Sequence, residues 1–123
     1  MTRYRKTGLA LASLAGLLST LSLSGTAQAA DASVTLTHNG HSVAQALSYG
    51  ANGAVRVCDL YPDGDGVRAY YSRVSGGEQI LYDAKGSGTC SETTDIPGNP
   101  IRKFQACVVD TVVVCTPYVY TGR

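Results

Sequence analysis

The sequence predicts an all-β domain, a small antiparallel β-sandwich or barrel of about six strands with two disulfides. Three observations support this fold class. Short β-prone runs follow one another about every ten residues, separated by Gly, Asp, Asn and Pro. No stretch after residue 30 shows a helical period or the spacing of a β-α-β unit. All four cysteines lie in this β-prone part of the chain.

The segment before the domain has the pattern of a secretory signal. Three of the first six residues are basic, residues 9–23 are uncharged and rich in Leu and Ala, and Ala27-Gln28-Ala29 has the small residues of a cleavage site. Several Ser residues dilute the apolar run, which makes it a poor transmembrane helix. We therefore expect a cleaved signal at 1–29 and one domain at 30–123, ordered over about 32–120. We expect no membrane attachment after cleavage.

The first half of the domain contains predicted strands at 33–37 and 54–60, with a strand or an irregular segment at 43–49 between them. Asn39-Gly40 predicts a tight turn, because both residues tolerate a positive φ. Pro62–Gly66 predicts a hairpin turn, because Pro presets one φ and each Gly permits a positive one. The same segment is a poor calcium loop, because apolar or aromatic side chains occupy positions that need ligands.

The second half of the domain contains four predicted strands, at 67–73, 79–83, 101–109 and 111–120. Gly76-Gly77 predicts the turn between the first two of these strands. The last two form a predicted hairpin, and the uncharged, β-prone residues 111–116 favour a buried central strand. Between the second and third strands, two prolines in the link Cys90–Pro100 prevent regular ladder pairing.

Four cysteines in an exported chain predict two disulfides, and three pairings are possible. We expect Cys107–Cys115, because these residues lie on the two arms of the final hairpin, where facing Cα atoms are within disulfide reach. That leaves Cys58–Cys90 as the second bridge. Cys107 falls on the polar side of its strand and Cys115 on the apolar side, so we expect a bulge at Asp110-Thr111 to bring them opposite each other.

Charge and motifs argue against several classes of function. Residues 30–123 carry seven Lys and Arg against nine Asp and Glu, a net charge of −2 without a basic stripe, which argues against nucleic-acid binding. His38 and His41 have no third ligand nearby in the sequence and there is no Cys-x-x-Cys, so we expect no metal site. The chain contains no Gly-x-Ser-x-Gly motif. We therefore expect no catalytic residues and no cofactor.

Tyrosines are the most suggestive residues for binding. Tyr70 and Tyr71 must point to opposite faces of their strand, whereas Tyr118 and Tyr120 share a face. A surface cluster of tyrosines favours contact with another macromolecule or a glycan. We take Tyr70, Tyr118 and Tyr120 as candidate binding residues. The alternative is that tyrosines supply core volume, because the chain has one Phe and no Trp.

Several runs resemble small exported proteins of actinomycetes. These runs are Val55–Asp59, Asp63–Tyr70 and Asp83–Cys90, followed by Cys107 and Cys115. The resemblance covers most of the predicted domain and implies export and a disulfide-bonded β domain. It implies no activity.

We therefore expect a secreted, monomeric β-module that binds an extracellular protein or glycan without catalysis. One alternative is an inhibitor of a secreted protease or glycosidase. Its contact loop would be residues 93–100 or the segment between Cys107 and Cys115. A further alternative is a cell-surface structural protein that assembles through exposed strands.

Overall fold

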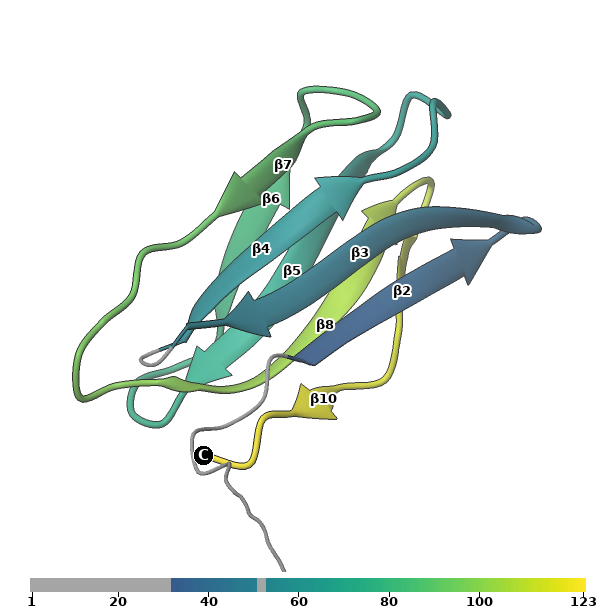
Figure 1. The fold of residues 1–123 in the computed structure, drawn as a ribbon. Helices are drawn as coiled ribbons and strands as arrows, with labels where there is room; N and C mark the ends of the chain where they lie inside the picture. Colours follow the sequence, from purple (N-terminus) through teal and green to yellow (C-terminus); the bar gives the residue numbers. More distant parts are fainter. Residues whose placement is uncertain (1–31, 51–52) are drawn as a thin grey trace, which may run out of the picture.

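The structure, a computed structural model, describes residues 32–50 and 53–123 and shows two antiparallel sheets packed face to face (Figure 1). The all-β sandwich with two disulfides predicted from the sequence is confirmed. The expected signal at 1–29 lies outside the described residues. Within the described ranges, no helix has the length and apolarity that crossing a membrane requires.

The first sheet has the strand order β2-β3-β4-β7. Its strands are β2 (Ala32–His38), β3 (His41–Tyr49), β4 (Ala54–Asp59) and β7 (Cys90–Glu92). The predicted turn at Asn39-Gly40 joins β2 to β3, with φ of 51° and 80° at its two residues. Both positive angles suit a two-residue hairpin loop whose twist matches that of the strands. The segment at 43–49 is therefore a strand.

The second sheet has the order β10-β8-β5-β6, and β9 also pairs with β8. Its strands are β5 (Gly66–Arg73), β6 (Gln79–Asp83), β8 (Ile101–Val109), β9 (Val113–Cys115) and β10 (Val119–Tyr120). The prediction of a hairpin turn at Pro62–Gly66 is wrong. β4 pairs with β3 and β7, so this segment takes the chain from one sheet to the other. Turn residues determine that the chain bends, but not which strands pair after the bend.

The described residues contain nine strands where the sequence predicts about six. β7 is a short edge strand in the segment predicted to be an irregular link. The predicted strand 111–120 is divided into β9 and β10 at Thr116–Tyr118, where Pro117 has no N–H for the ladder. There the Thr116 hydroxyl accepts the Ala106 N–H at 3.1 Å, in place of a main-chain acceptor.

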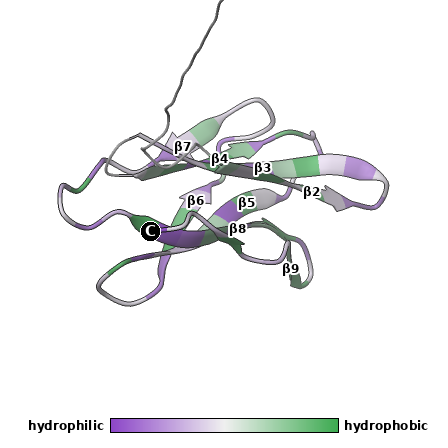
Figure 2. Cartoon of the chain, turned by 60° about the horizontal axis from the view of Figure 1, so that its bottom comes forward, coloured by the Kyte–Doolittle hydropathy of each residue, from purple (hydrophilic) through white to green (hydrophobic). Residues whose placement is uncertain are grey.

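The hydrophobic core lies between the sheets. Figure 2 shows the two layers, and β3 and β4 of one layer lie over β8 and β5 of the other. Phe104 is the largest fully buried side chain, and Tyr71 is also buried. The remaining buried members are mostly Val and Ala: Leu36, Val43, Ala44, Ala46, Val55, Val57, Val67, Ala69, Ile101, Ala106 and Val108.

Residues 111–116 do not form a buried central strand, contrary to the prediction. Val112 is 65% exposed and Val113 is 43% exposed. β9 is a three-residue strand that pairs with β8 alone, so its other edge has no partner among the described strands. High β-propensity indicates a strand but does not distinguish a central strand from an edge strand.

Both predicted disulfides are present, and each joins directly opposite residues of neighbouring strands. The Cα atoms are 4.0 Å apart in Cys58–Cys90 and 4.1 Å apart in Cys107–Cys115. The expected bulge at Asp110-Thr111 is wrong, because β8 and β9 pair without a register shift. The sequence-based assignment of faces took exposed Val113 for a core residue. Cys107 and Cys115 in fact share the outer face.

Candidate functional site

Four tyrosines lie on the outer face of the second sheet, and we call this surface the tyrosine face. Its members are Tyr70 on β5, Tyr82 on β6, Tyr118 just before β10 and Tyr120 on β10. Strand alternation places them there, because Ala69 and Tyr71 on either side of Tyr70 are buried in the core. Tyr82 and Tyr120 are 49% and 64% exposed, so their rings are open to solvent.

Arg68 connects two of these rings. Its guanidinium donates a hydrogen bond to the Tyr70 hydroxyl at 2.8 Å. The same group lies 5.8 Å from the centroid of the Tyr70 ring and 5.4 Å from that of the Tyr82 ring. Arg68 and Tyr82 are directly opposite each other in the β5–β6 pairing. These contacts hold the two rings in place on the sheet through cation–π attraction and one hydrogen bond.

Lys103 has the corresponding position beside the other two rings. Its ammonium lies 4.3 Å from the centroid of the Tyr118 ring and 6.0 Å from that of Tyr120. The Tyr118 hydroxyl donates a hydrogen bond to the Glu78 carboxylate. Burial, this hydrogen bond and the negative charge of Glu78 raise the pKa of Tyr118 to about 12. Tyr118 therefore stays protonated across the physiological pH range.

The three tyrosines proposed from the sequence thus share one face of the structure. The sequence reasoning missed Tyr82, Arg68 and Lys103. Alternation within the strands already places Arg68 beside Tyr70 and Tyr82 beside Ile80 on common faces. It does not show that β6, β5, β8 and β10 are neighbours, and this order brings the six side chains together.

The loop between β7 and β8 is fixed to the sandwich by Arg73. This buried guanidinium donates hydrogen bonds to three main-chain carbonyls, those of Gly53 at 3.1 Å, Thr94 at 2.9 Å and Asn99 at 3.0 Å. The Asn99 side chain also exchanges two hydrogen bonds with the main chain of Ser75. The loop therefore has an anchored base, while the side chain at its tip, Ile96, is 43% exposed.

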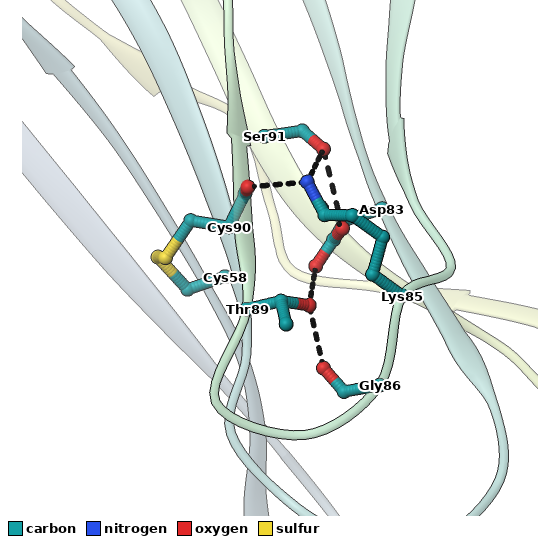
Figure 3. Close-up of polar contacts among 7 residues, drawn as sticks. All are labelled: Cys58, Asp83, Lys85, Gly86, Thr89, Cys90 and Ser91. Carbon is teal, nitrogen blue, oxygen red and sulfur yellow. Dashed lines mark hydrogen bonds and ion pairs between the residues drawn. A yellow bond between two sulfur atoms is a disulfide. The ribbon is translucent and has the colours of Figure 1, made fainter.

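A second polar cluster surrounds Asp83, close to the Cys58–Cys90 disulfide (Figure 3). The carboxylate accepts hydrogen bonds from Thr89 at 2.6 Å and Ser91 at 3.2 Å, and the Lys85 ammonium lies 3.3 Å away. Burial alone would raise the pKa of Asp83, but these donors outweigh burial and hold it below the ordinary value of 3.8. The cluster ties β6 to β7 across the two sheets, which indicates a structural role.

The two histidines do not face a common ligand. His38 lies 3.6 Å from the Asp110 carboxylate, whereas His41 stacks on Tyr61 with ring centroids 4.0 Å apart. In the part of the chain that the structure describes, no three His, Cys, Asp or Glu side chains are arranged to hold a metal ion.

No protein-family model matches this chain, and no curated protein or solved structure matches it either. Any assignment of function therefore depends on the chemistry of the residues described above.

Proposed function

We propose that this protein is a secreted, non-catalytic β-module that binds an extracellular glycan through the tyrosine face. The observation that supports the proposal is the grouping of four tyrosine rings with Arg68 and Lys103 on one face of a sheet. Two disulfides fit an oxidising extracellular compartment, and the signal expected at 1–29 is the matching export route.

Tyrosine suits a sugar ligand because its ring has an apolar face and a polar tip. A pyranose ring likewise has an apolar C–H face and a rim of hydroxyl groups. A tyrosine side chain has only two χ angles, and fixing it in a complex therefore costs little conformational entropy. The cation contacts on this face reduce that cost further, because the rings are already held before a ligand arrives.

A glycan fits this face better than an apolar protein surface does. The buried centre of a protein–protein interface is enriched in apolar side chains as well as in Tyr and Arg. The outer face of the second sheet has two large exposed aliphatic side chains among its described residues. Ile80 lies on the tyrosine face, and Val113 lies at the far end of the sheet beside Cys115. The other large exposed aliphatic residues of the described chain lie in turns and loops: Leu60, Val74, Ile96 and Val112.

Affinity electrophoresis in gels that contain neutral or acidic polysaccharides tests the proposal. We expect one class to retard the protein, and we expect Tyr70→Ala and Tyr120→Ala each to weaken binding about tenfold. Tyr49→Ala is the matched control, because Tyr49 lies on the opposite sheet beside Arg56 and Glu92. Binding to no polysaccharide, or equal losses in all three variants, would contradict the proposal.

The anchored loop at 93–100 supports a second candidate function, inhibition of a secreted protease or glycosidase. The three hydrogen bonds of Arg73 and the two of Asn99 hold the loop before any enzyme binds, which lowers the entropy cost of docking. A turn closes its tip, with the Asn99 N–H bound to the Ile96 carbonyl at 3.0 Å. A panel of secreted hydrolases tests this candidate, and inhibition should fall in Ile96→Asp. A panel without an inhibited enzyme would remove it.

A further inference from the structure

A cavity of about 290 Å³ opens at one end of the tyrosine face. Arg102 and Lys103 of β8 line it together with Tyr120, Ser72 and the turn that follows β5. Tyr120 is a member of the tyrosine face, and Lys103 contacts its ring. The cavity is therefore continuous with the proposed glycan-binding surface.

A β-bulge brings the two cations to the same cavity. Ser72 pairs with Lys103, but the next residue, Arg73, pairs with Ile101, so Arg102 is an extra residue in β8. In a regular strand, neighbours such as Arg102 and Lys103 would point to opposite faces of the sheet. A bulge redirects one side chain, and such bulges are frequent beside functional sites.

The cavity has positive charge that no described carboxylate neutralises by an ion pair. The ion pairs in which both residues are described involve other cations, namely His38, Arg56 and Lys85. Glu78, which lies near Tyr118, instead accepts the Tyr118 hydroxyl hydrogen bond. An anion in the cavity would therefore meet Arg102 and Lys103 without first having to displace an acidic side chain.

We propose that this cavity binds the carboxylate of a uronic acid residue within an acidic polysaccharide, and this inference rests on the proposed function. Arg102 and Lys103 donate charge-assisted hydrogen bonds to the carboxylate, which are stronger than bonds between neutral groups. The sugar ring of the same residue packs on the exposed Tyr120 ring. This ring contact favours a uronic acid over a polyol phosphate chain, because a polyol has no pyranose face to stack.

Calorimetric titration of the purified protein with galacturonic acid oligomers tests the proposal, with the fully methyl-esterified oligomers as the uncharged control. We expect esterification to weaken binding about tenfold or more, and added salt to weaken binding only of the free acid. These two measurements need no variant, so they do not depend on how a mutant folds.

Variants then locate the site. We expect Arg102→Gln to weaken binding of the free acid about tenfold and to leave any binding of the ester unchanged. Lys103→Gln should weaken binding of both ligands, and of the free acid more, because Lys103 also contacts the Tyr118 and Tyr120 rings. Arg56→Gln is the matched control, because Arg56 lies on the other sheet in an exposed pair with Glu92. Thermal unfolding of each variant checks that the fold is retained.

The possible outcomes separate the two proposals. Equal binding of acid and ester, lost in Tyr70→Ala but kept in Arg102→Gln, would overturn the uronate site and leave the glycan-binding function standing. A polyol phosphate titrated in the same way provides a third comparison. If it bound as tightly as the free acid or more tightly, the ring contact assigned to Tyr120 would be overturned. Failure of both oligomers and of every polysaccharide in the gels would overturn both proposals.

Discussion

Arg73 is a buried cation whose hydrogen-bond acceptors are three main-chain carbonyls, that of Gly53 and two in the loop at 93–100. A guanidinium has five N–H donors in a planar fork, so one side chain can reach all three acceptors at once. The aromatic ring of Tyr71 lies 6.0 Å below the charge. One residue thereby holds the loop at 93–100 against the end of β5.

We expect Arg73→Lys to lower the free energy of unfolding by about 2–4 kcal/mol, because a compact ammonium leaves at least one carbonyl without its charged donor. Denaturant unfolding measures this loss. Hydrogen exchange should also accelerate at Asn99, whose N–H closes the turn at the loop tip. An unchanged free energy of unfolding would show that the loop is held by other contacts.

Tyr118 is a titration probe within the candidate site. We expect one tyrosine to ionise with a pKa of about 12, and Glu78→Gln to move that pKa toward the ordinary value of 10.0. Because folding raises the pKa of Tyr118, the protonated side chain contributes to stability. This contribution is fully present below pH 10.0 and is lost as the pH rises toward about 12. Phenolate absorbance during alkaline titration measures the shift, and Tyr118→Phe assigns it. A titration unchanged by Glu78→Gln would contradict the contact.

At the scale of the strands, the two disulfides differ in the length of chain that they close. Cys58–Cys90 has a sequence separation of 32 and Cys107–Cys115 one of 8. In the chain-entropy model, the longer loop contributes nearly 4 kcal/mol and the shorter one about 2–3 kcal/mol. The first bridge also holds β7, a three-residue edge strand, against β4.

We therefore expect the Cys58→Ala/Cys90→Ala variant to lose more stability than the Cys107→Ala/Cys115→Ala variant, by about 1 kcal/mol. For a domain of this size, that difference corresponds to roughly 4–8 °C in Tm. Calorimetry of the two double variants tests the order. Equal losses, or the reverse order, would show that strain or packing around buried Cys107 outweighs loop entropy.

Asp83 joins β6 to β7 through hydrogen bonds that favour its ionised form. Its pKa in the folded state lies below 3.8, so its contribution to stability is present above that pH and is lost as the pH falls through the folded value. We expect Asp83→Asn to be less stable than the wild type at neutral pH, with the difference narrowing in acid. Urea unfolding across the acid range measures it.

Asp59 is the natural control for this pH dependence. Asp59 is also buried, and burial raises its pKa above 3.8. Its carboxylate accepts a hydrogen bond from the Tyr61 N–H at 3.3 Å, which lowers the pKa by less than burial raises it. Its contribution to stability is therefore greatest in acid and is lost as the pH rises through its folded pKa. At neutral pH, Asp59→Asn should therefore be more stable than the wild type. If Asp59→Asn and Asp83→Asn both lost stability at neutral pH, the opposite pKa shifts of the two carboxyl groups would be contradicted.

At the scale of the molecule, the sandwich gives the chain two outer faces of different character. The outer face of the second sheet contains four tyrosines with two cations, whereas that of the first contains Tyr49 beside Arg56 and Glu92. The candidate binding residues thus lie on one outer face, and the control variants Tyr49→Ala and Arg56→Gln change residues on the other. This asymmetry arises from which strands share a sheet.

The signal expected at 1–29 gives a further prediction for the whole chain. The pattern at Ala27-Gln28-Ala29 predicts that the exported protein begins at Ala30. N-terminal sequencing of protein from culture supernatant checks this position. Recovery of material that begins at Met1 would show that no signal is removed at this position and would contradict the export route in the proposed function.

Most individual strands were predictable, because alternation of apolar and polar residues and the turn residues between strands are local properties. β7 was missed because a strand of three residues, Cys90–Glu92, is too short to show a period. The split between β9 and β10 was missed although Pro117 marks it, because the flanking residues are strongly β-prone. The two disulfides were predicted with the correct pairing even though Cys115 was assigned to the wrong face of its strand.

The sequence by itself determined that this chain forms a β domain with two disulfides, because β-propensity, turn residues and cysteine number act over short distances or independently of topology. Only the tertiary structure decided that Pro62–Gly66 crosses between sheets and that β8 has a bulge at Arg102. Both features depend on which strands pair. Strand pairing is determined by contacts between residues far apart in the sequence, and local sequence patterns do not specify these contacts. The candidate site belongs to this second class, since its residues come from four strands that neighbour one another only in the folded sheet.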